Sequence, residues 1–561
     1  MQNKSMEVVI SGISGRFPMS DNLDEFWENL VNGKDMISDE HDRFSNLGMK
    51  FPTRMGVLNS LDKFDAEFFS TPESQVNMMS PKLRILQETT FEAIIDAGIL
   101  PASLQGSNTG VYVGASLDET GSILARSGQM KNVYGVLGNE FCMLASRLSY
   151  TFNLNGPSIA LDTACSASSV ALQQGLQAIQ TGLCDAVIVS GGNTKVDPYS
   201  CRMFFTANMT SPEGKCKTFD SSANGFVRSE AVISTYICKR QGAKRAYATL
   251  LHAATNCDGY KKLGIHFPSA MFQEKLARQV YEGIGLDPLQ VDYIEAHGTG
   301  TQVGDREEMT AISKVFCEGR KGPLLVGSVK SNMGHAEQTS GLCGITKLVL
   351  SHCTGILPAN LHYCVSNPEI PSLVDGRVQV VDTNRPFNAK YCAINSMGFG
   401  GVNSHVLLKF DEDHQEEENP WNPSIPLVIL GSGRTEEAVN DFLKRALSHH
   451  ENQHFVKLIH ELSKGSIEKN PFRGYVVTTA DRTEMVVEKN EAKQSVWFIC
   501  TGFGGQWPGM SRDNVLVGIS AVQIGLIDLL KSIGVEPDGI IGYSVGEFIA
   551  CYADECVTQA Q

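Results

Sequence analysis

The sequence predicts a layered α/β fold for residues 1–410. From residue 7 to about 410, short apolar runs with strand character alternate with helix-like segments, and glycine-rich turns join them. The clearest apolar runs are GVYVGAS (110–116), AVIVSGG (186–192) and LLVGSVK (324–330). Apolar runs without polar alternation are typical of strands that are buried on both faces of a sheet. Together these observations favour sheets covered by layers of helices.

Two further pieces follow this region. A linker is predicted where an acidic run gives way to three prolines, in DEDHQEEENPWNPSIP (411–426). Strand-like PLVILGS, helix-like TEEAVNDFLKRALSHH and strand-like GYVVTTA then indicate a small α/β module. A third piece opens at WFICTGFGGQWPGM. We therefore predict domains at 1–410, 411–496 and 497–561, because a single core rarely grows past about 300 residues.

Bulk composition excludes several classes of function. The net charge of −15 argues against broad binding to nucleic acid or to an anionic membrane. No window approaches 18 uninterrupted apolar residues, so membrane insertion is not expected. The start of the chain lacks a signal-peptide pattern, and the 15 cysteines are scattered without C-x-x-C pairs. We expect no metal site, mostly reduced thiols and a cytoplasmic location.

One cysteine stands at a strand-to-helix turn, in PSIALDTACSASSVALQQGLQAIQ (157–180). Residues 159–161 are expected to form a buried strand end, and Leu172, Leu176 and Ile179 recur at helical spacing. Cys165 lies between them, among small residues that leave its sulfur accessible. A helix N-terminus favours negative charge, so we expect an easily formed thiolate. The alternative is a packed structural cysteine.

Two histidines and a glycine-rich turn also follow predicted strands. They lie in VDYIEAHGTGTQVGD (291–305), which contains His297, and GSVKSNMGHAEQTSG (327–341), which contains Lys330 and His335. The turn in INSMGFGGVNSHVLL (394–408) can offer amide donors to an oxyanion. Either histidine alone is more often structural. Strand ends of one polarity gather the sites of α/β folds, so the three segments together predict an active site.

The blocks DTACSAS, EAHGTGT, KSNMGHAE and GFGGVNSH, in this order, resemble the β-ketoacyl synthase family. The resemblance covers residues 7–410 and is greatest to the condensing domain of animal-type type I fatty acid synthase. It implies a thiolase-like five-layer αβαβα fold with two similar halves, usually as a homodimer. It also implies that no cofactor is bound directly. The substrates are instead carried on the phosphopantetheine arm of an acyl carrier protein.

The resemblance also implies a role for each candidate residue. Cys165 would take an acyl chain as a thioester. His297 and His335 would hold the thioester carbonyl of malonyl-carrier and stabilise the enolate left when carbon dioxide departs. That carbanion attacks the Cys165 thioester in a decarboxylative Claisen condensation. The backbone amides of Cys165 and Phe399 would form an oxyanion hole, with Phe399 also a gate, and Lys330 would hold the network by its charge.

The last piece resembles the start of a malonyl/acetyl transferase. GYSVGEFIACYAD contains a G-x-S-x-G nucleophile elbow at Ser544, and Gln506 would match an oxyanion-side glutamine. Only 38 residues separate them, from 506 to 544, and none of the 17 residues after Ser544 is histidine. We therefore expect this transferase fragment to be inactive.

Three alternatives for the whole chain remain at this point. The first is a catalytically incomplete fatty acid synthase fragment that acts as a dimerising scaffold or inhibitor. The second is the condensing region of a fatty-acid-synthase-like polyketide synthase. The third, a serine acyltransferase or hydrolase, depends on Ser544 alone.

Overall fold

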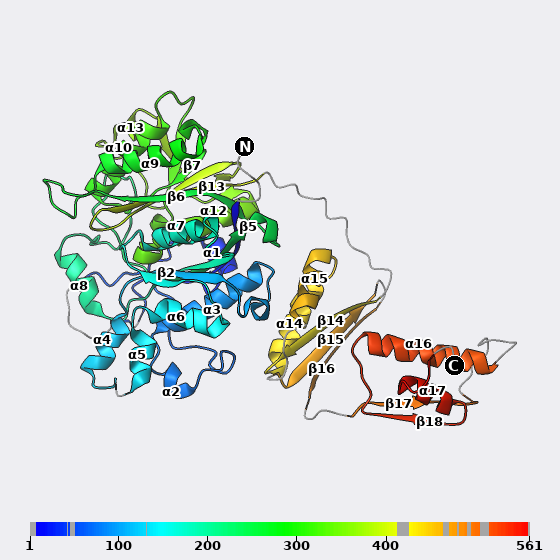
Figure 1. Ribbon diagram of the computed structural model, residues 1–561. Helices are drawn as coiled ribbons and strands as arrows, with labels where there is room; N and C mark the ends of the chain where they lie inside the picture. The colour runs from blue at the N-terminus through cyan, green and yellow to red at the C-terminus, as the bar shows by residue number, and fades with distance from the viewer. Residues whose placement is uncertain are drawn as a thin grey trace. The chain divides into compact units, whose positions relative to one another are not determined.

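The computed structural model describes most of the chain (Figure 1). The described residues are 7–41, 43–44, 51–130, 132–411, 426–463, 470–479, 482–490, 495–504 and 515–558. Contacts divide the chain into two compact units, Met1–Glu417 and Glu418–Gln561. The predicted acidic linker lies largely outside the described residues, as does Gln506.

The first half of the first unit surrounds the strands that lead to Cys165. Its elements are β1 (Val8–Arg16), α1 (Leu23–Val31), α2 (Glu73–Val76), α3 (Pro81–Asp96), η2 (Pro101–Leu104), β2 (Thr109–Ala115), α4 (Glu119–Arg126), α5 (Val133–Asn139), α6 (Met143–Phe152), β3 (Ser158–Leu161), α7 (Ala167–Gln180), β4 (Ala186–Asn193), α8 (Pro198–Thr206), β5 (Ala231–Lys239) and η3 (Arg240–Gly242).

The second half carries the two histidines. Its elements are β6 (Ala248–Cys257), α9 (Ala270–Ile284), η4 (Pro288–Gln290), β7 (Tyr293–Glu295), α10 (Gln302–Phe316), β8 (Leu324–Gly327), α11 (Lys330–Met333), η5 (Glu337–Thr339), α12 (Ser340–Thr354), β9 (Ile356–Leu357), α13 (Pro371–Val374), β10 (Val378–Val380), β11 (Arg385–Pro386), β12 (Tyr391–Met397) and β13 (Val402–Lys409).

The two halves share one strand topology. The hydrogen-bonded order is β10-β8-β7-β12-β13-β6-β1-β5-β4-β2-β3. In the first half β2 pairs in parallel with β3 and β4, and β4, β5 and β1 continue antiparallel. In the second half β7 pairs in parallel with β8 and β12, and β12, β13 and β6 continue antiparallel. A short pairing of β1 with β6 joins the halves. By this symmetry β8 is the counterpart of β3.

Helices divide the unit into layers. α7 packs on β2 and β4 of the first half, on β6 of the second half, and on α12. α12 packs on β12 and β5, so both helices lie between the two sets of strands. α3 and α6 cover the other face of the first half, and α9 covers β6 and β13. These are the five layers that the sequence analysis predicted.

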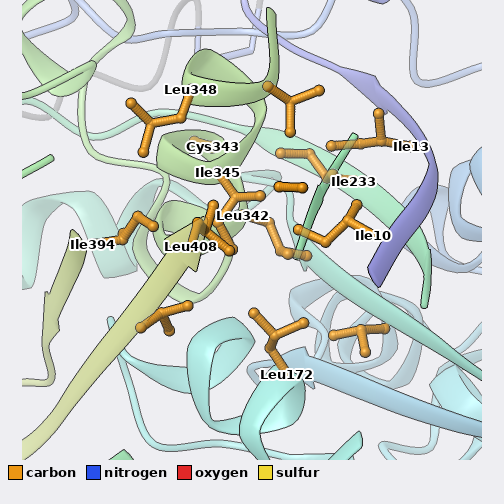
Figure 2. Packing of buried hydrophobic residues seen from close by; sticks show 14 of the residues in the cluster. Ile10, Ile13, Leu172, Ile233, Leu342, Cys343, Ile345, Leu348, Ile394 and Leu408 are labelled. Carbon is orange, nitrogen blue, oxygen red and sulfur yellow. The ribbon is translucent and has the colours of Figure 1, made fainter. Parts of the chain in front are cut away.

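The central core lies where the two inner helices meet the strands. Figure 2 shows Leu342, Ile345 and Leu348 of α12 gathered with side chains from both halves. Leu172 of α7 belongs to the same buried cluster, as do Ile10, Ile13 and Ile233 of the first half and Ile394 and Leu408 of the second. The core therefore fixes α7 against α12, and with them the segments just before each helix.

A glycine at the end of β2 lets α7 approach closely. A Cβ on Gly114 would lie 2.5 Å from the backbone carbon of Ala167 and 2.5 Å from the backbone nitrogen of Ser168. We expect Gly114→Ala to lower the free energy of unfolding by about 1–3 kcal/mol in urea titrations, because backbone must move. Gly242→Ala is the control, since no atom lies within 4 Å of its Cβ. Equal midpoints for the two variants would contradict this packing.

One local prediction was wrong. The segment 159–161 was expected to be a buried strand end, but β3 is the outermost strand and its Ile159 is 40% exposed. An edge strand has hydrogen-bonding groups open on one side, which a short apolar run in the sequence does not reveal.

The second unit contains two smaller sheets. Its elements are β14 (Leu427–Gly433), α14 (Glu436–Ser448), α15 (Gln453–Leu462), β15 (Phe472–Thr478), β16 (Thr483–Lys489), β17 (Trp497–Cys500), α16 (Val515–Ser532), β18 (Gly539–Gly542) and α17 (Gly546–Ala553). β14, β15 and β16 form an antiparallel sheet with α14 and α15 packed on it, and β17 pairs in parallel with β18. Among the described helices, α16 has the length and apolar composition to cross a membrane. One such helix is weak evidence, because core helices of soluble proteins share these properties.

Candidate active site

Cys165 lies at a sharp bend between β3 and α7. Ala164 has φ +56°, a left-handed conformation that is rare and costly for alanine. The N–H of Ala167 donates to the carbonyl of Ala164 over 2.9 Å and starts the helix. Cys165 lines a cavity of about 480 Å³. The strand–turn–helix position predicted for Cys165 is therefore present.

His335 reaches the cysteine from the equivalent place in the second half. It follows β8 and the short α11, and its Nε2 lies 3.0 Å from Sγ of Cys165. Its backbone N–H donates to the carbonyl of Val227 over 2.8 Å, and its carbonyl accepts from Ser229 over 3.0 Å. Both backbone bonds fix the loop, so the imidazole is held against the sulfur.

A buried network of charged side chains holds the segment that follows His335. Glu337 accepts from Nε of Arg228 at 2.6 Å and from Nζ of Lys195 at 3.0 Å. Its backbone is in the left-handed region, with φ +43°. Burial opposes ionisation of Glu337, but Arg228 and Lys195 outweigh it and hold the pKa of this carboxyl well below its usual range. The network therefore clamps a strained loop two residues from the imidazole.

His297 meets His335 edge to face. The two ring centroids are 5.2 Å apart with an interplanar angle of 89°. Nδ1 of His297 accepts from the backbone N–H of Met397 over 3.3 Å, which leaves the ring proton on Nε2. Glu308 accepts from the backbone N–H groups of His297 and Gly298 at 2.8 and 2.9 Å. These bonds set both the tautomer and the position of His297.

Both histidines are neutral in the free protein. Burial and, to a smaller extent, the nearby charge of Lys330 lower the pKa of His335 to about 3. Burial, Lys330 and His335 hold the pKa of His297 well below its ordinary value. The charge of Lys330 acts on both histidines through space. A neutral imidazole offers one N–H donor and one acceptor nitrogen.

The expected easily formed thiolate is not found. Burial and, to a smaller extent, the charge of Glu337 raise the pKa of the Cys165 thiol to about 12. The backbone N–H of Phe399 and the charge of Lys330 oppose this rise but do not overcome it. The helix N-terminus alone was the basis of the expectation, and desolvation outweighs it. The resting site therefore holds a protonated thiol beside a neutral imidazole.

The glycine-rich turn brings Phe399 to the same cavity. Its backbone N–H and that of Cys165 both interact with the Cys165 sulfur, which places two donors around the reacting atom. The Phe399 side chain lines the cavity and is 50% exposed. The structure thus brings Cys165, His297, His335 and Phe399 together around one cavity, and the charge of buried Lys330 acts on both histidines. The roles of these residues in catalysis stay predictions.

Several functional residues were missed from the sequence. Glu308 holds the His297 loop, and Glu337 with Arg228 and Lys195 holds the His335 loop. The available signal for Glu337 was its place in the KSNMGHAE block, two residues after the histidine. Arg228 and Lys195 come from distant segments, and no local pattern points to their pairing.

The second unit forms the bend predicted at Ser544. Ser544 follows β18, precedes α17 and has φ +56°, the strained backbone expected of a nucleophile elbow. A Cβ on Gly502 would lie 2.7 Å from the Cβ of Ser544, so only glycine allows the close approach of that loop. The oxyanion role predicted for Gln506 concerns a residue outside the described part of the chain.

Comparisons with known proteins follow the same order along the chain. Residues 5–240 match the beta-ketoacyl synthase N-terminal domain and residues 247–364 its C-terminal domain. Residues 366–477 match the ketoacyl-synthetase C-terminal extension and residues 511–561 the acyl transferase domain. A fatty acid synthase of Anser anser anser is 44% identical over 345 residues, which is 62% of this chain and 98% of that sequence. The chain belongs to the β-ketoacyl synthase family.

A polyketide synthase and a solved ketosynthase structure are also similar to this chain. One subunit of the phenolphthiocerol/phthiocerol polyketide synthase of Mycobacterium tuberculosis (strain CDC 1551 / Oshkosh) is 33% identical over 91% of this chain, which spans 31% of that sequence. The ketosynthase from module 6 of the bacillaene synthase of Bacillus subtilis 168 has a TM-score of 0.72 at 29% identity, covering 84% of this chain and 83% of that one. The fold is thiolase-like. The chain contains the condensing region of a fatty acid synthase or a related polyketide synthase.

Proposed function

We propose that this ketosynthase lengthens an acyl chain by decarboxylative condensation on Cys165. One observation carries the proposal: a cysteine sulfur, two neutral imidazoles and two backbone donors converge on a single cavity. Each group has a place in the two half-reactions of the cycle. We favour a fatty acid synthase over a polyketide synthase as the source of this condensing region. The reason is that the goose fatty acid synthase is more identical to this chain than the mycobacterial polyketide synthase is.

The first half-reaction is acyl transfer. The Cys165 sulfur attacks the carbonyl of an acyl thioester, the bond from that carbonyl to the carrier sulfur breaks, and the thiol proton ends on the carrier sulfur. In this proposal the N–H groups of Cys165 and Phe399, which both interact with the sulfur, hold the oxyanion that forms on the way. Because the thiol is protonated at rest, its proton leaves only as the new bond forms, and Nε2 of His335 at 3.0 Å can guide it.

The second half-reaction is decarboxylation and carbon–carbon bond formation. Once Cys165 is acylated, the imidazole N–H groups of His297 and His335 are free to donate to the carbonyl of a malonyl thioester. They stabilise the enolate that remains when carbon dioxide leaves, because each neutral imidazole keeps one N–H donor. The enolate carbon attacks the carbonyl of the Cys165 thioester, and the bond from that carbonyl to the Cys165 sulfur breaks. The sulfur leaves as the thiolate and takes up one proton from water. The product is a 3-ketoacyl thioester two carbons longer.

The substrates are proposed to arrive on the phosphopantetheine arm of an acyl carrier protein. The protein is also proposed to act in the cytosol and to form a homodimer. The 15 free cysteines support a reducing compartment. The open edge of β3, with Ile159 exposed, supports pairing with a second copy. A monomeric mass in light scattering would contradict the dimer.

Intact-mass spectrometry tests the function. The protein is incubated with a long-chain acyl thioester as wild type, Cys165→Ala and Ser544→Ala. We expect acylation of the wild type and of Ser544→Ala, and none of Cys165→Ala. A wild type that takes up no acyl group would leave only a scaffold or inhibitor role. Loss confined to Ser544→Ala would instead assign the chemistry to the transferase piece.

A further inference from the structure

Two exposed cysteines lie close together outside the ketosynthase site, at the C-terminal end of α17. Cys551 is in the last turn of this helix, and Cys556 follows the helix with four residues between the two. Both are free and exposed, so reagents in solution can reach both sulfurs. The function proposed for Cys165 uses neither of them.

The backbone after α17 folds back and makes these two residues neighbours. The N–H of Cys556 donates to the carbonyl of Cys551 over 2.9 Å, and the N–H of Glu555 donates to the carbonyl of Tyr552 over 3.0 Å. Glu555 has φ +61°, in the left-handed region. Two such bonds around a left-handed residue form a Schellman motif. In this motif the side chain at the position of Cys556 commonly packs on the last helical turn, where Cys551 lies.

Bonds to α16 hold this turn in place. Nζ of Lys531 donates to the carbonyl of Ala553 over 2.8 Å and to Oε1 of Glu555 over 3.1 Å. The hydroxyl of Tyr552 donates to Oδ1 of Asp528 over 2.7 Å. Because both partners belong to a neighbouring helix, the turn keeps its shape, and with it the short separation of the two cysteines.

The two thiols also interact electrostatically. The pKa of Cys556 is raised, chiefly by the hydrogen bond from its Sγ to Oδ2 of Asp554 at 3.5 Å and, to a smaller extent, by the charge of Cys551. Salt screens exposed charges that are more than about 10 Å apart, so such an interaction acts at short range. The backbone motif and the charge interaction therefore agree that the two sulfurs are neighbours.

We propose that Cys551 and Cys556 form a redox-active dithiol that hydrogen peroxide oxidises to an intramolecular disulfide. One thiolate sulfur attacks an oxygen of the peroxide, the O–O bond breaks and hydroxide leaves, which gives a sulfenic acid. The second thiolate attacks that sulfur, the S–O bond breaks and a second hydroxide leaves. The two thiol protons convert both hydroxides to water, so two electrons pass from the sulfurs to the peroxide.

The disulfide cross-links the end of α17 to the segment that follows it. α17 is the helix that begins after the bend at Ser544, so oxidation fixes the far end of the elbow helix. A thiol reductant returns the pair to two thiols by exchange. The dithiol belongs to the second unit, and its oxidation does not depend on the condensation proposed at Cys165.

The test locates the disulfide by mass spectrometry in the full chain. Reduced protein is treated with hydrogen peroxide, its remaining thiols are blocked with N-ethylmaleimide, and the denatured chain is cut by a protease that cleaves after glutamate. Cleavage after Glu555 separates Cys551 from Cys556, so only a disulfide keeps the two fragments joined. The variants are Cys551→Ser and Cys556→Ser. Cys142→Ser is the matched control, because Cys142 is also exposed.

We expect joined fragments from the wild type and from Cys142→Ser in equal yield, and none from Cys551→Ser or Cys556→Ser. Dithiothreitol should separate the joined fragments. Asp554→Asn should speed disulfide formation about three- to tenfold at neutral pH. The reason is that this variant removes the carboxylate that raises the pKa of Cys556, so more of the thiol is present as thiolate.

Two results would overturn the inference. The first is fragments that separate without reductant, each with its cysteine blocked by maleimide or carrying its own oxygen atoms, because the two sulfurs then do not meet. The second is a disulfide that joins two chains through Cys551 or Cys556, seen as a doubled mass before cleavage. In that case exposure alone, and not the turn after α17, controls the oxidation.

Discussion

His297→Ala should slow carbon dioxide release from a malonyl thioester by about 10²–10³-fold, while acylation of Cys165 continues. The reason is the geometry of the two imidazoles. Nδ1 of His297 is occupied by the N–H of Met397, so its only proton is on Nε2, available to an enolate oxygen. His297 makes no contact with the sulfur among the interactions of the described residues. The measurement is carbon dioxide release together with intact-mass acylation of the same samples.

His335→Ala should slow both half-reactions, the acylation of Cys165 and the decarboxylation of the malonyl thioester. Nε2 of His335 lies 3.0 Å from the sulfur and the ring also faces His297. We expect a loss of decarboxylation similar to that of His297→Ala and, in addition, slower acylation. The exposed His454 is the control, and His454→Ala should match the wild type. If both active-site variants release carbon dioxide at the wild-type rate, enolate stabilisation by these histidines is wrong.

Glu337→Gln should lower the free energy of unfolding of the ketosynthase unit by about 3–5 kcal/mol. This carboxylate balances two buried cations, Arg228 and Lys195, whose side chains are 5% and 4% exposed. The amide that replaces it leaves both buried cations without the carboxylate to which they are hydrogen-bonded. The loop around Glu337 would also lose the ion pairs that hold its left-handed backbone. Urea titration followed by intrinsic fluorescence measures the change.

A surface pair provides the comparison for this variant. Arg306 and Glu369 lie 3.1 Å apart with side chains 43% and 62% exposed. Glu369→Gln should change stability by less than about 1 kcal/mol, because water screens an exposed pair. If Glu337→Gln is equally mild, then the two buried cations do not depend on this carboxylate. A double variant, Lys195→Met with Glu337→Gln, should recover part of the loss, because it removes one of the two stranded charges.

The sequence was sufficient for those parts of the site that depend on local pattern. A small-residue turn between a strand and a helix placed Cys165, and glycine-rich segments after strands placed His297, His335 and Phe399. These features are local because strand, turn and helix are neighbours in the chain. The layered α/β arrangement follows from the same alternation, repeated over both halves.

Properties that depend on distant segments could not be obtained in this way. The pKa of the Cys165 thiol is set by how deeply the fold buries it, and the helix terminus considered alone predicted the opposite direction. The pairing of Glu337 with Arg228 and Lys195 joins three segments that are far apart in the chain. The exposure of Ile159 depends on the place of β3 at the end of the sheet. Each of these requires knowing which segments become neighbours.

The matching strand order of the two halves has a consequence for how this ketosynthase can fail. The nucleophile follows β3 in the first half, and its histidine partner follows β8, the counterpart in the second. Neither half contains a complete active site, so the enzyme is active only when the two halves are correctly packed against each other. Ser169 of α7 and Gly341 of α12 meet so closely that a Cβ on the glycine would overlap the serine oxygen. A substitution at this contact between α7 and α12 can therefore abolish activity although no catalytic residue has been changed in the sequence.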